Sequence, residues 1–225
     1  MKGKISLTFD DGWKCIYDNA FPILSQYKIT STHFVVSGFF DSVQFPQYMN
    51  VEHVRELERN GHEVGCHTVS HKHLPEETAS IIQNEVTLSK KYMSDLGLKI
   101  TNFAYPYGEY DDRVLASVKN AGYSSARSTI RGFNAEEVDK YLLRCQAVKV
   151  DTEVKEVIDW LNCAKENNSW LILMFHQIDH EGREWSTTPE KLKEIVSFIR
   201  SSNVSVYNIR DALLENESTA KVHSI

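Results

Sequence analysis

Two adjacent carboxylates follow an apolar segment near the start of the chain, where the sequence SLTFDDGW contains Asp10 and Asp11 just before a glycine turn. Paired acidic side chains at the end of a strand favour the binding of a cation or of a proton. Downstream, the segment HTVSH places His67 and His71 four residues apart, a spacing that puts both imidazoles on one face of a helical turn. One aspartate and two histidines leave coordination positions open for water, as in catalytic zinc-type centres. The sequence therefore predicts a catalytic metal site with a second carboxylate available as a base.

These two segments resemble the first two motifs of the polysaccharide deacetylases, the NodB-like carbohydrate esterases of family 4, which read Thr-Phe-Asp-Asp-Gly and His-Ser/Thr-x-x-His. The family's fifth motif, an apolar strand ending in histidine, is matched by LILMFH, which ends at His176. The resemblance implies that Asp11, His67 and His71 hold one divalent metal ion, Asp10 is the general base and His176 is the general acid. Zn²⁺ is the first choice of ion, and Co²⁺, Ni²⁺ or Mn²⁺ suit the same ligands.

The third family motif, Arg-x-Pro-Tyr/Phe, is only partly present. Pro106 and Tyr107 match it, and the resemblance implies that the backbone N–H of Tyr107 stabilises the oxyanion of the reaction. An alanine replaces the arginine, which in the family pairs with the catalytic aspartate. We predict that Arg127, from the following strand, reaches Asp10 instead, with Arg144 as the alternative.

The fourth family motif supplies an aspartate that orients the catalytic histidine, and this chain has none at the matching place. Asp151 and Asp179 are both candidates for that role. No motif assigns either residue, so the choice between them stays open.

Aromatic side chains near the motifs are candidates for substrate contact. We expect Trp13, Trp185 and Pro106 to contact the substrate, because an indole face can stack on a sugar ring. Trp160 and Trp170 are expected to be core or lid aromatics.

Length and composition are typical of one enzyme-sized domain. The chain has 225 residues, of which 41% are hydrophobic and 11% aromatic, which is enough to bury a substantial core. Its formal net charge is −6, and it has no dense cluster of lysine and arginine, which argues against nucleic acid as a partner. The four cysteines lack the paired spacing of metal sites, so buried thiols are expected at Cys15, Cys66, Cys145 and Cys163.

Short apolar runs alternate with helical patterns along the chain, which predicts parallel strands joined by helices. Because the residues of the expected site follow several different strands, they can converge only at the mouth of a barrel. We therefore predict an α/β fold, a distorted (β/α) barrel with seven or eight strands in a single domain at 1–214, followed by a frayed C-terminal tail at 215–225. The resemblance implies the same fold. Strands are expected at 4–9, 32–37, 62–66, 101–105, 123–128, 142–150, 170–176 and 204–208, and helices at 51–60, 76–96, 112–121 and from Pro189 onward.

The chain begins with Met1 and enters the first expected strand without an apolar segment long enough for a signal peptide or a membrane span. As written it is expected to be cytoplasmic, without a membrane partner, and extracellular if an export signal has been removed. The sequence does not determine an oligomeric state. The histidines outside the motifs are expected to be solvated loop residues: His33, His53, His62, His73, His180 and His223.

Three functions are compatible with these residues. The first is a metal-dependent N-deacetylase that removes the acetyl group of an N-acetylated amino sugar, free or in a chain, and releases acetate. The second is a hydrolase of another small linear or cyclic amide. A comparison of activity on sugar oligomers with activity on small amides would distinguish the second function from the first. The third is a non-catalytic carbohydrate-binding relative, suggested by the incomplete third and fourth motifs. The retained Asp10 and the complete ligand set argue against the third.

Overall fold

A closed barrel of parallel strands forms the centre of the protein in the computed structural model, which describes residues 3–135 and 137–222. Strands β2 to β7 follow one another around the barrel, and β1 lies between β7 and β2 and closes it. Strand β8 pairs with the start of β1. The predicted barrel is confirmed. The strands are β1 (Lys4–Phe9), β2 (Thr32–Val35), β3 (Glu63–Cys66), β4 (Asn102–Ala104), β5 (Ser125–Arg131), β6 (Leu143–Ala147), β7 (Trp170–Phe175) and β8 (Ser205–Val206).

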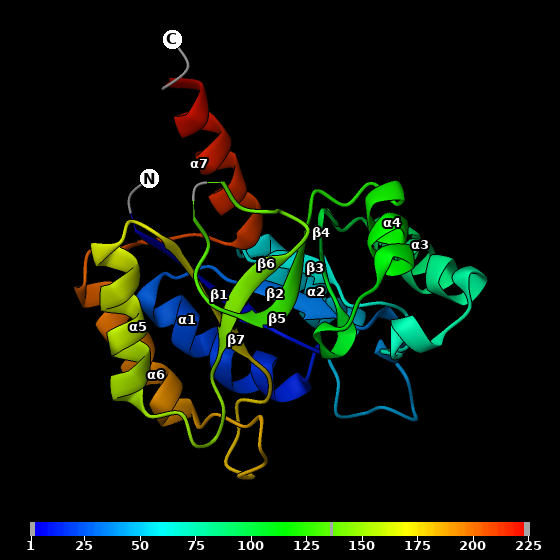
Figure 1. Cartoon of the computed structure of the whole chain (residues 1–225). Coiled ribbons are helices and arrows are strands. Elements are labelled where there is room, and N and C mark those ends of the chain that lie inside the picture. The colour runs from blue at the N-terminus through cyan, green and yellow to red at the C-terminus, as the bar shows by residue number, and fades with distance from the viewer. Residues whose placement is uncertain (1–2, 136, 223–225) are drawn as a thin grey trace.

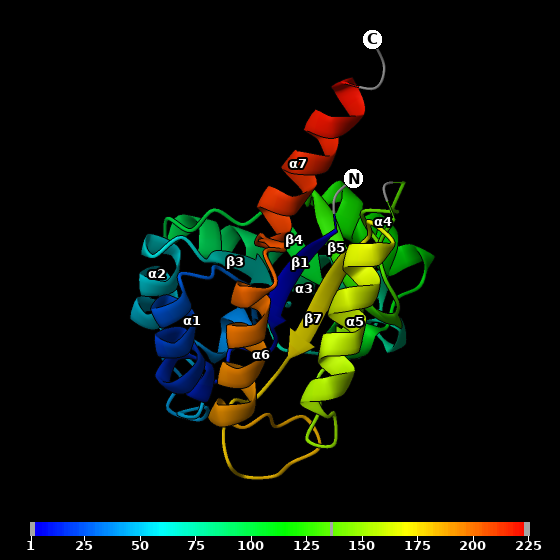
Figure 2. The same cartoon turned by 90° about the vertical axis from the view of Figure 1, so that its left-hand side faces the viewer.

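Seven α-helices and four short helical turns connect the described strands, and Figures 1 and 2 show that α1, α5 and α6 cover one side of the barrel while α3 and α4 cover the other. The predicted helices near 51–60, 76–96, 112–121 and after Thr188 are confirmed as α2, α3, α4 and α6. Helices α1 and α5 were not foreseen. The helical elements are η1 (Ile16–Ala20), α1 (Phe21–Tyr27), η2 (Ser37–Phe39), α2 (Val51–Arg59), η3 (Leu74–Glu76), α3 (Ala79–Asp95), η4 (Pro106–Gly108), α4 (Asp112–Asn120), α5 (Val154–Glu166), α6 (Pro189–Ser201) and α7 (Ile209–Val222).

The helix boundaries follow local capping. Helix α3 begins later than expected, because the side chain of Thr78 accepts a hydrogen bond from the backbone N–H of Ile81 and starts the helix there. Asn50 caps α2 and Thr188 caps α6 in the same way. Capping residues therefore determine where three of these helices begin.

Helix α7 replaces the expected frayed tail over residues 215–222, and 223–225 lie outside the described residues. Figures 1 and 2 show α7 leaving the end of the barrel at which the strands begin. The buried ammonium of Lys4 holds it there by contacts with Glu215 at 3.1 Å and Asn216 at 2.6 Å. The sequence pattern missed this helix because its stabilising contacts come from the first strand.

Alternation along the strands divides the core into an inner and an outer set of side chains. On β1, Ile5, Leu7 and Phe9 are fully buried in the outer layer, packed among apolar residues of α1, α5 and α6. The intervening side chains face into the barrel, where Thr8 donates a hydrogen bond to the Leu173 carbonyl of β7. Asp10, which follows β1, continues this inward set and lies at the mouth of the barrel.

Two histidines that were expected in solvent are part of the core. His33 and His62 are 0% and 2% exposed, and the hydroxyl of Ser31 lies 2.9 Å from a ring nitrogen of each. Burial lowers the pKa of both, and that of His62 falls to about 4. His53 is half-buried beside Tyr17, which corrects its expected solvation, and His223 lies outside the described residues.

The four cysteines are free thiols. Cys66 and Cys145 are buried as expected, whereas Cys15 and Cys163 are only partly buried. Trp170 is fully buried and Trp160 is half-buried against the outer core layer, as expected for core aromatics.

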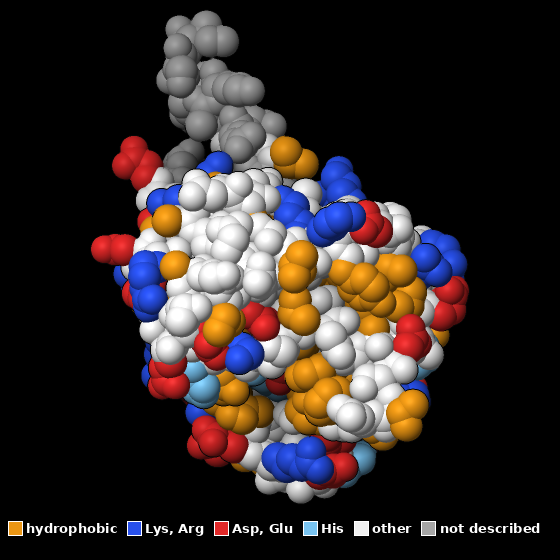
Figure 3. Space-filling model, turned by 90° about the vertical axis from the view of Figure 1, so that its right-hand side faces the viewer, with side chains coloured by type: hydrophobic (Ala, Val, Ile, Leu, Met, Phe, Trp, Pro, Cys, Tyr) orange, Lys and Arg blue, Asp and Glu red, His pale blue; other side chains and the backbone are white. Residues whose placement is uncertain are grey.

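The surface in Figure 3 carries basic and acidic side chains interspersed, and its hydrophobic side chains form separate groups. That face therefore offers no extended basic surface for a polyphosphate. Within residues 3–135 and 137–222, no helix has the length and apolar character needed to cross a bilayer.

Candidate active site

The adjacent strands β1 and β7 bring two predicted catalytic side chains together. Phe9 pairs with Phe175, and the backbone N–H of Asp10 donates to the Phe175 carbonyl at 2.9 Å. Because both strands end at this level, Asp10 and His176 lie side by side at the mouth of the barrel, with Nε2 of His176 3.9 Å from Oδ2 of Asp10.

One cavity of about 390 Å³ collects most of the predicted site residues at this mouth. Pro106 and Arg127 do not form its wall: Pro106 is buried in the turn η4, and Arg127 lies beneath Asp10. The predicted residues that line the cavity are Asp10, Asp11, Trp13, His67, His71, Tyr107, His176 and Trp185.

Three donor groups converge on one point of this cavity. Oδ1 of Asp11 lies 3.5 Å from Nε2 of His67 and 3.3 Å from Nε2 of His71, and the three ligand atoms are all within 4.8 Å of one another. Burial raises the pKa of Asp11, but the two facing imidazoles lower it more, so the pKa is well below its usual value and the group is a carboxylate. Oδ1 is buried and accepts no hydrogen bond from the described residues. An orphaned anionic oxygen facing two imidazole nitrogens fits a divalent cation.

Neighbouring groups orient these donors. Nδ1 of His67 lies 2.8 Å from the Ala104 carbonyl, which leaves Nε2 directed at Asp11. The indole N–H of Trp13 donates to the other oxygen of Asp11 at 2.9 Å. Trp13 in turn stacks on Tyr48, with ring centroids 4.5 Å apart. Tyr48 lies in a loop without motif character and was not predicted from the sequence.

His67 and His71 do not lie on a helical turn, which corrects the prediction from their spacing. They belong to the loop between β3 and η3, in which Thr68 and His71 both have positive φ, 71° and 56°. Glu85 of α3 supports the loop by accepting bonds from the Ser70 N–H at 2.8 Å and the Ser70 hydroxyl at 2.6 Å. Non-glycine residues in the left-handed region persist only when the surroundings enforce them, and they cluster at functional sites. Asp11, with φ of 69°, is a third such residue at the cavity.

Arg127 makes the contact with Asp10 that was predicted for it in the absence of the family arginine. Its side chain is 0% exposed and forms an ion pair with Oδ2 of Asp10, which is itself 4% exposed. Burial lowers the pKa of Arg127, but Asp10 raises it more, so the guanidinium stays charged. Ala104, at the position of the family arginine, carries no charge, and Arg144 approaches Gly132 instead of Asp10. The guanidinium thus reaches the same carboxylate from a neighbouring strand.

Among the described residues, neither Asp151 nor Asp179 hydrogen-bonds to His176, which corrects the expectation that one of them orients it. Its buried Nδ1 has no hydrogen-bond partner among the described residues. The ring of Trp185 packs on it with centroids 4.6 Å apart, and the ammonium of Lys149 lies 4.0 Å above the Trp185 ring. Burial lowers the pKa of His176 although Asp10 and Asp11 raise it.

Tyr107 lies in a strained turn, and its ring centroid is 4.6 Å from that of His71. Its φ is 57°, and the following Gly108 also has positive φ, 73°. A Cβ at Gly108 would overlap the side chain of Thr129, so the close approach requires glycine. The Tyr107 backbone N–H makes no hydrogen bond within the described part of the chain and is free to donate.

His73 is an exposed loop residue, as expected, and it also contacts the turn that carries Tyr107. Its ring stacks on that of Tyr107 with centroids 3.7 Å apart and planes 5° from parallel, and its Nδ1 pairs with Glu109 at 2.8 Å. The sequence offered only the proximity of His73 to His71 as a signal. His180 is exposed, as expected.

The profile of the polysaccharide deacetylase family matches residues 1–126, more than half of the chain. The chain belongs to the polysaccharide deacetylase family. It is 31% identical over 122 residues to a peptidoglycan-N-acetylglucosamine deacetylase of Bacillus cereus, covering 54% of each chain. It is 29% identical over 148 residues to a poly-beta-1,6-N-acetyl-D-glucosamine N-deacetylase of Staphylococcus aureus, covering 60% of this chain and 49% of that protein. The chain thus spans about half the length of these curated relatives.

The fold of this polysaccharide deacetylase is shared with solved structures. The Xyl-CE4 domain of a multidomain xylanase from the hindgut metagenome of Trinervitermes trinervoides superimposes with a TM-score of 0.70 at 17% identity, covering 96% of this chain and 92% of that one. This likeness supports the barrel architecture.

Proposed function

We propose that this protein is a metal-dependent N-deacetylase that hydrolyses the N-acetyl group of an amino sugar, free or within a polysaccharide, and releases acetate. The observation that carries the proposal is the convergence of Asp11, His67 and His71 beside Asp10 and His176 in one cavity. The family and the names of the relatives support a carbohydrate substrate with an acetamido group.

Asp11, His67 and His71 would hold the ion, because their donor atoms converge and one of them is an orphaned carboxylate oxygen. Two imidazoles and a carboxylate suit Zn²⁺ first, and also Co²⁺, Ni²⁺ or Mn²⁺. A bound divalent ion supplies Lewis acidity, which polarises a carbonyl and makes water a better nucleophile near neutral pH.

Asp10 is the general base in this proposal. Its Oδ1 accepts no hydrogen bond among the described residues, so this oxygen is available to take a proton from the attacking water. The Arg127 guanidinium engages Oδ2 and thereby fixes the orientation of the carboxylate. Arg127 is therefore a positioning residue for the base.

His176 is the general acid, which delivers a proton to the leaving nitrogen so that a neutral amine departs. It lies beside Asp10 and packs on Trp185 in the wall of the cavity that Tyr107 also lines. The free N–H of Tyr107 would donate to the oxyanion of the tetrahedral intermediate, and one such donor is typically worth about 3 kcal/mol in the transition state. Water and the acetamide are thereby converted to acetate and a free amino group.

Acetate release from a panel of N-acetylated sugars and small amides tests the proposal. The metal-loaded protein is compared with Asp10→Asn and His176→Ala, and with the exposed-residue controls Asp95→Asn and His180→Ala. Release from sugars that needs added metal, collapses in the first two variants and persists in the controls is the expected result. Release from small amides alone would favour the alternative hydrolase. No release from any compound by folded protein with one metal bound would favour a binding relative.

A further inference from the structure

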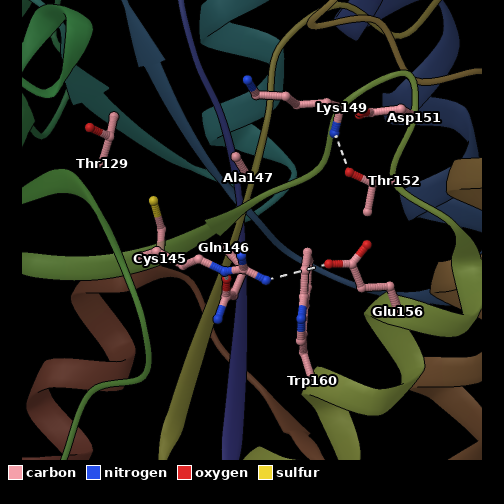
Figure 4. A pocket seen from close by; sticks show the side chains of 10 residues that line it. Thr129, Cys145, Gln146, Ala147, Lys149, Asp151, Thr152, Glu156 and Trp160 are labelled. Atoms are coloured by element: carbon pink, nitrogen blue, oxygen red, sulfur yellow. Dashed lines mark hydrogen bonds and ion pairs between the residues drawn. The ribbon is translucent and has the colours of Figure 1, made fainter.

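Two cavities of similar volume lie apart from the catalytic one, and they differ in charge. The first, of about 300 Å³, lies beside β6 and α5 and is shown in Figure 4. Lys149 lines it together with Asp151 and Glu156, and Glu156 pairs with Arg131 at 3.4 Å. Opposite charges offset one another there, so this cavity favours no ligand of one sign. The second cavity, of about 290 Å³, is lined by charged residues of one sign only.

The second cavity lies at the end of the barrel where the strands begin and from which α7 leaves (Figure 1). Residues around the starts of β4 and β5, in the loop before β6 and in the first turns of α7 form its wall. Among the described residues, the wall is made of Lys99, Thr101, Asn102, Ser124, Lys140, Arg210, Leu213 and Leu214, and we call it the basic cavity. Three of these side chains are cationic and none is acidic, although the whole chain has a net charge of −6.

The cations of the basic cavity are available to a ligand. Within residues 3–135 and 137–222, the ammonium groups of Lys99 and Lys140 form no hydrogen bond or ion pair, and that of Lys140 lies 5.7 Å from the centre of the Tyr141 ring. Only Nε of the Arg210 guanidinium approaches a carboxylate, Oδ1 of Asp211, at 3.7 Å. Cations that surround one hollow without matching carboxylates focus a positive potential into it, which attracts an anion.

The backbone of Arg210 is anchored before any ligand binds. Its N–H donates to Oε2 of Glu63 at 2.9 Å, and the N–H of Ile209 donates to the hydroxyl of Thr32 at 2.9 Å. That hydroxyl in turn donates to Oε2 of Glu63 at 2.9 Å. These bonds fix the first turn of α7 against β2 and β3. Part of the ordering cost of binding is therefore already met in the free protein.

The buried carboxyl group of Glu63 does not line the cavity. Asn102, which does, donates its amide to Oε1 of Glu63 and accepts a bond from the Ser125 hydroxyl at 2.6 Å. Burial raises the pKa of Glu63, although its hydrogen bonds lower it. The Ser124 hydroxyl donates to no group in the described part of the chain. Besides its cations, the cavity thus presents a hydroxyl donor and no carboxylate acceptor.

We propose that the basic cavity binds a phosphate group, either as the free ion or on a small organic molecule. A phosphate carries up to about two negative charges at neutral pH and has several acceptor oxygens, so it can meet cations from three segments of the chain. A carboxylate has one charge and two oxygens and would engage fewer of them. The volume is at the lower end of the range for small-ligand sites, and Leu213 supplies an apolar wall for an organic group. Because the site is at the other end of the barrel from Asp10 and His176, the proposal does not depend on the proposed function.

Calorimetric titration of the metal-loaded full chain, freed of excess metal, with inorganic phosphate and with glycerol phosphate tests the proposal at constant ionic strength. We expect saturable binding at millimolar concentrations. Lys99→Gln and Lys140→Gln should each weaken it about tenfold, as expected for one hydrogen bond to a charged group. Lys91→Gln, which removes an exposed lysine on α3, is the matched control and should leave the affinity unchanged.

The two ligands distinguish the sources of the phosphate. Tighter binding of glycerol phosphate indicates an organic phosphate, whereas equal or tighter binding of inorganic phosphate indicates the free ion. Both results support the site.

His71→Ala, which removes a proposed metal ligand, shows where the phosphate binds, and binding should persist in it. Loss of binding in this variant, with full binding in Lys99→Gln and Lys140→Gln, would place the phosphate on the metal and overturn the proposal. Absence of saturable binding by the unaltered chain would also overturn it. Both lysines are exposed, so their variants should fold, and an unchanged melting temperature without phosphate verifies this.

Discussion

Removal of the Arg127 guanidinium should impair the proposed general base, Asp10, and leave the proposed metal site intact. The side chains of Arg127 and Asp10 are 0% and 4% exposed, so Arg127→Met leaves an anion in a dry environment without its countercharge. Breaking a buried ion pair by removing one partner costs about 3–5 kcal/mol of stability. Because a domain of this size has about 5–15 kcal/mol available, the variant should fold but melt at a lower temperature.

The effect on turnover should be larger than the effect on metal affinity. A positioned general base contributes about 10²–10⁴ in rate, so loss of its orientation should lower kcat by about 100-fold or more. Within the described residues, the proposed ligands Asp11, His67 and His71 make no hydrogen bond or ion pair with Arg127. Their supports come from Trp13, from the Ala104 carbonyl at the end of β4 and from the loop after β3.

The assay measures kcat by acetate release and the metal Kd by titration, on protein shown to be folded by its thermal transition. Arg59→Met, an exposed arginine on α2, is the control. The double variant Arg127→Met with Asp10→Asn removes both charges and should recover part of the stability without recovering turnover. Unchanged kcat in folded Arg127→Met, or a metal Kd that weakens as much as kcat falls, would refute the reasoning.

Three further outcomes are expected. His71→Ala should reduce bound metal below one ion per chain and abolish acetate release, and full metal content by elemental analysis would contradict the ligand assignment. The free energy of unfolding should decrease as the pH falls from about 6.5 toward 4, because His62 binds a proton in the unfolded chain but not when it is buried in the folded one. The difference between the two pKa values is worth about 3 kcal/mol. In denaturant titrations, His62→Gln should flatten this decrease. Gly108→Ala should lower kcat with little change in metal Kd, because its Cβ collides with Thr129 and displaces the Tyr107 turn; unchanged kinetics would show that this turn is not used.

The order of strands and helices could be read from the sequence because local patterns control it. Apolar runs predicted β1 over its full length and β7 to within one residue, and the predicted helices at 51–60 and from Pro189 onward match α2 and α6. Helix α7 was missed, because Lys4 stabilises it from more than two hundred residues away. Long-range contacts of this kind leave no local pattern.

For the histidines too, local spacing was informative and long-range contacts could not be predicted. The spacing of His67 and His71 correctly predicted that the two imidazoles lie together, but it suggested a helical turn. Glu85 and two left-handed residues hold the histidines in a loop instead. His33 and His62 were predicted to be exposed, because hydrophobic periodicity does not indicate which polar side chains lie beside a buried hydroxyl such as that of Ser31.

The sequence by itself determined the family, the barrel class and the identity of the ligand and catalytic candidates, because these depend on residue types and on short spacings. Only the tertiary structure decided that Arg127 meets Asp10, and that Trp185 packs on His176 while no carboxylate among the described residues binds its Nδ1. The physical reason is that a parallel barrel brings the ends of distant strands within a few ångströms of one another. Which side chains then meet depends on strand register and burial, and these are properties of the whole packed chain.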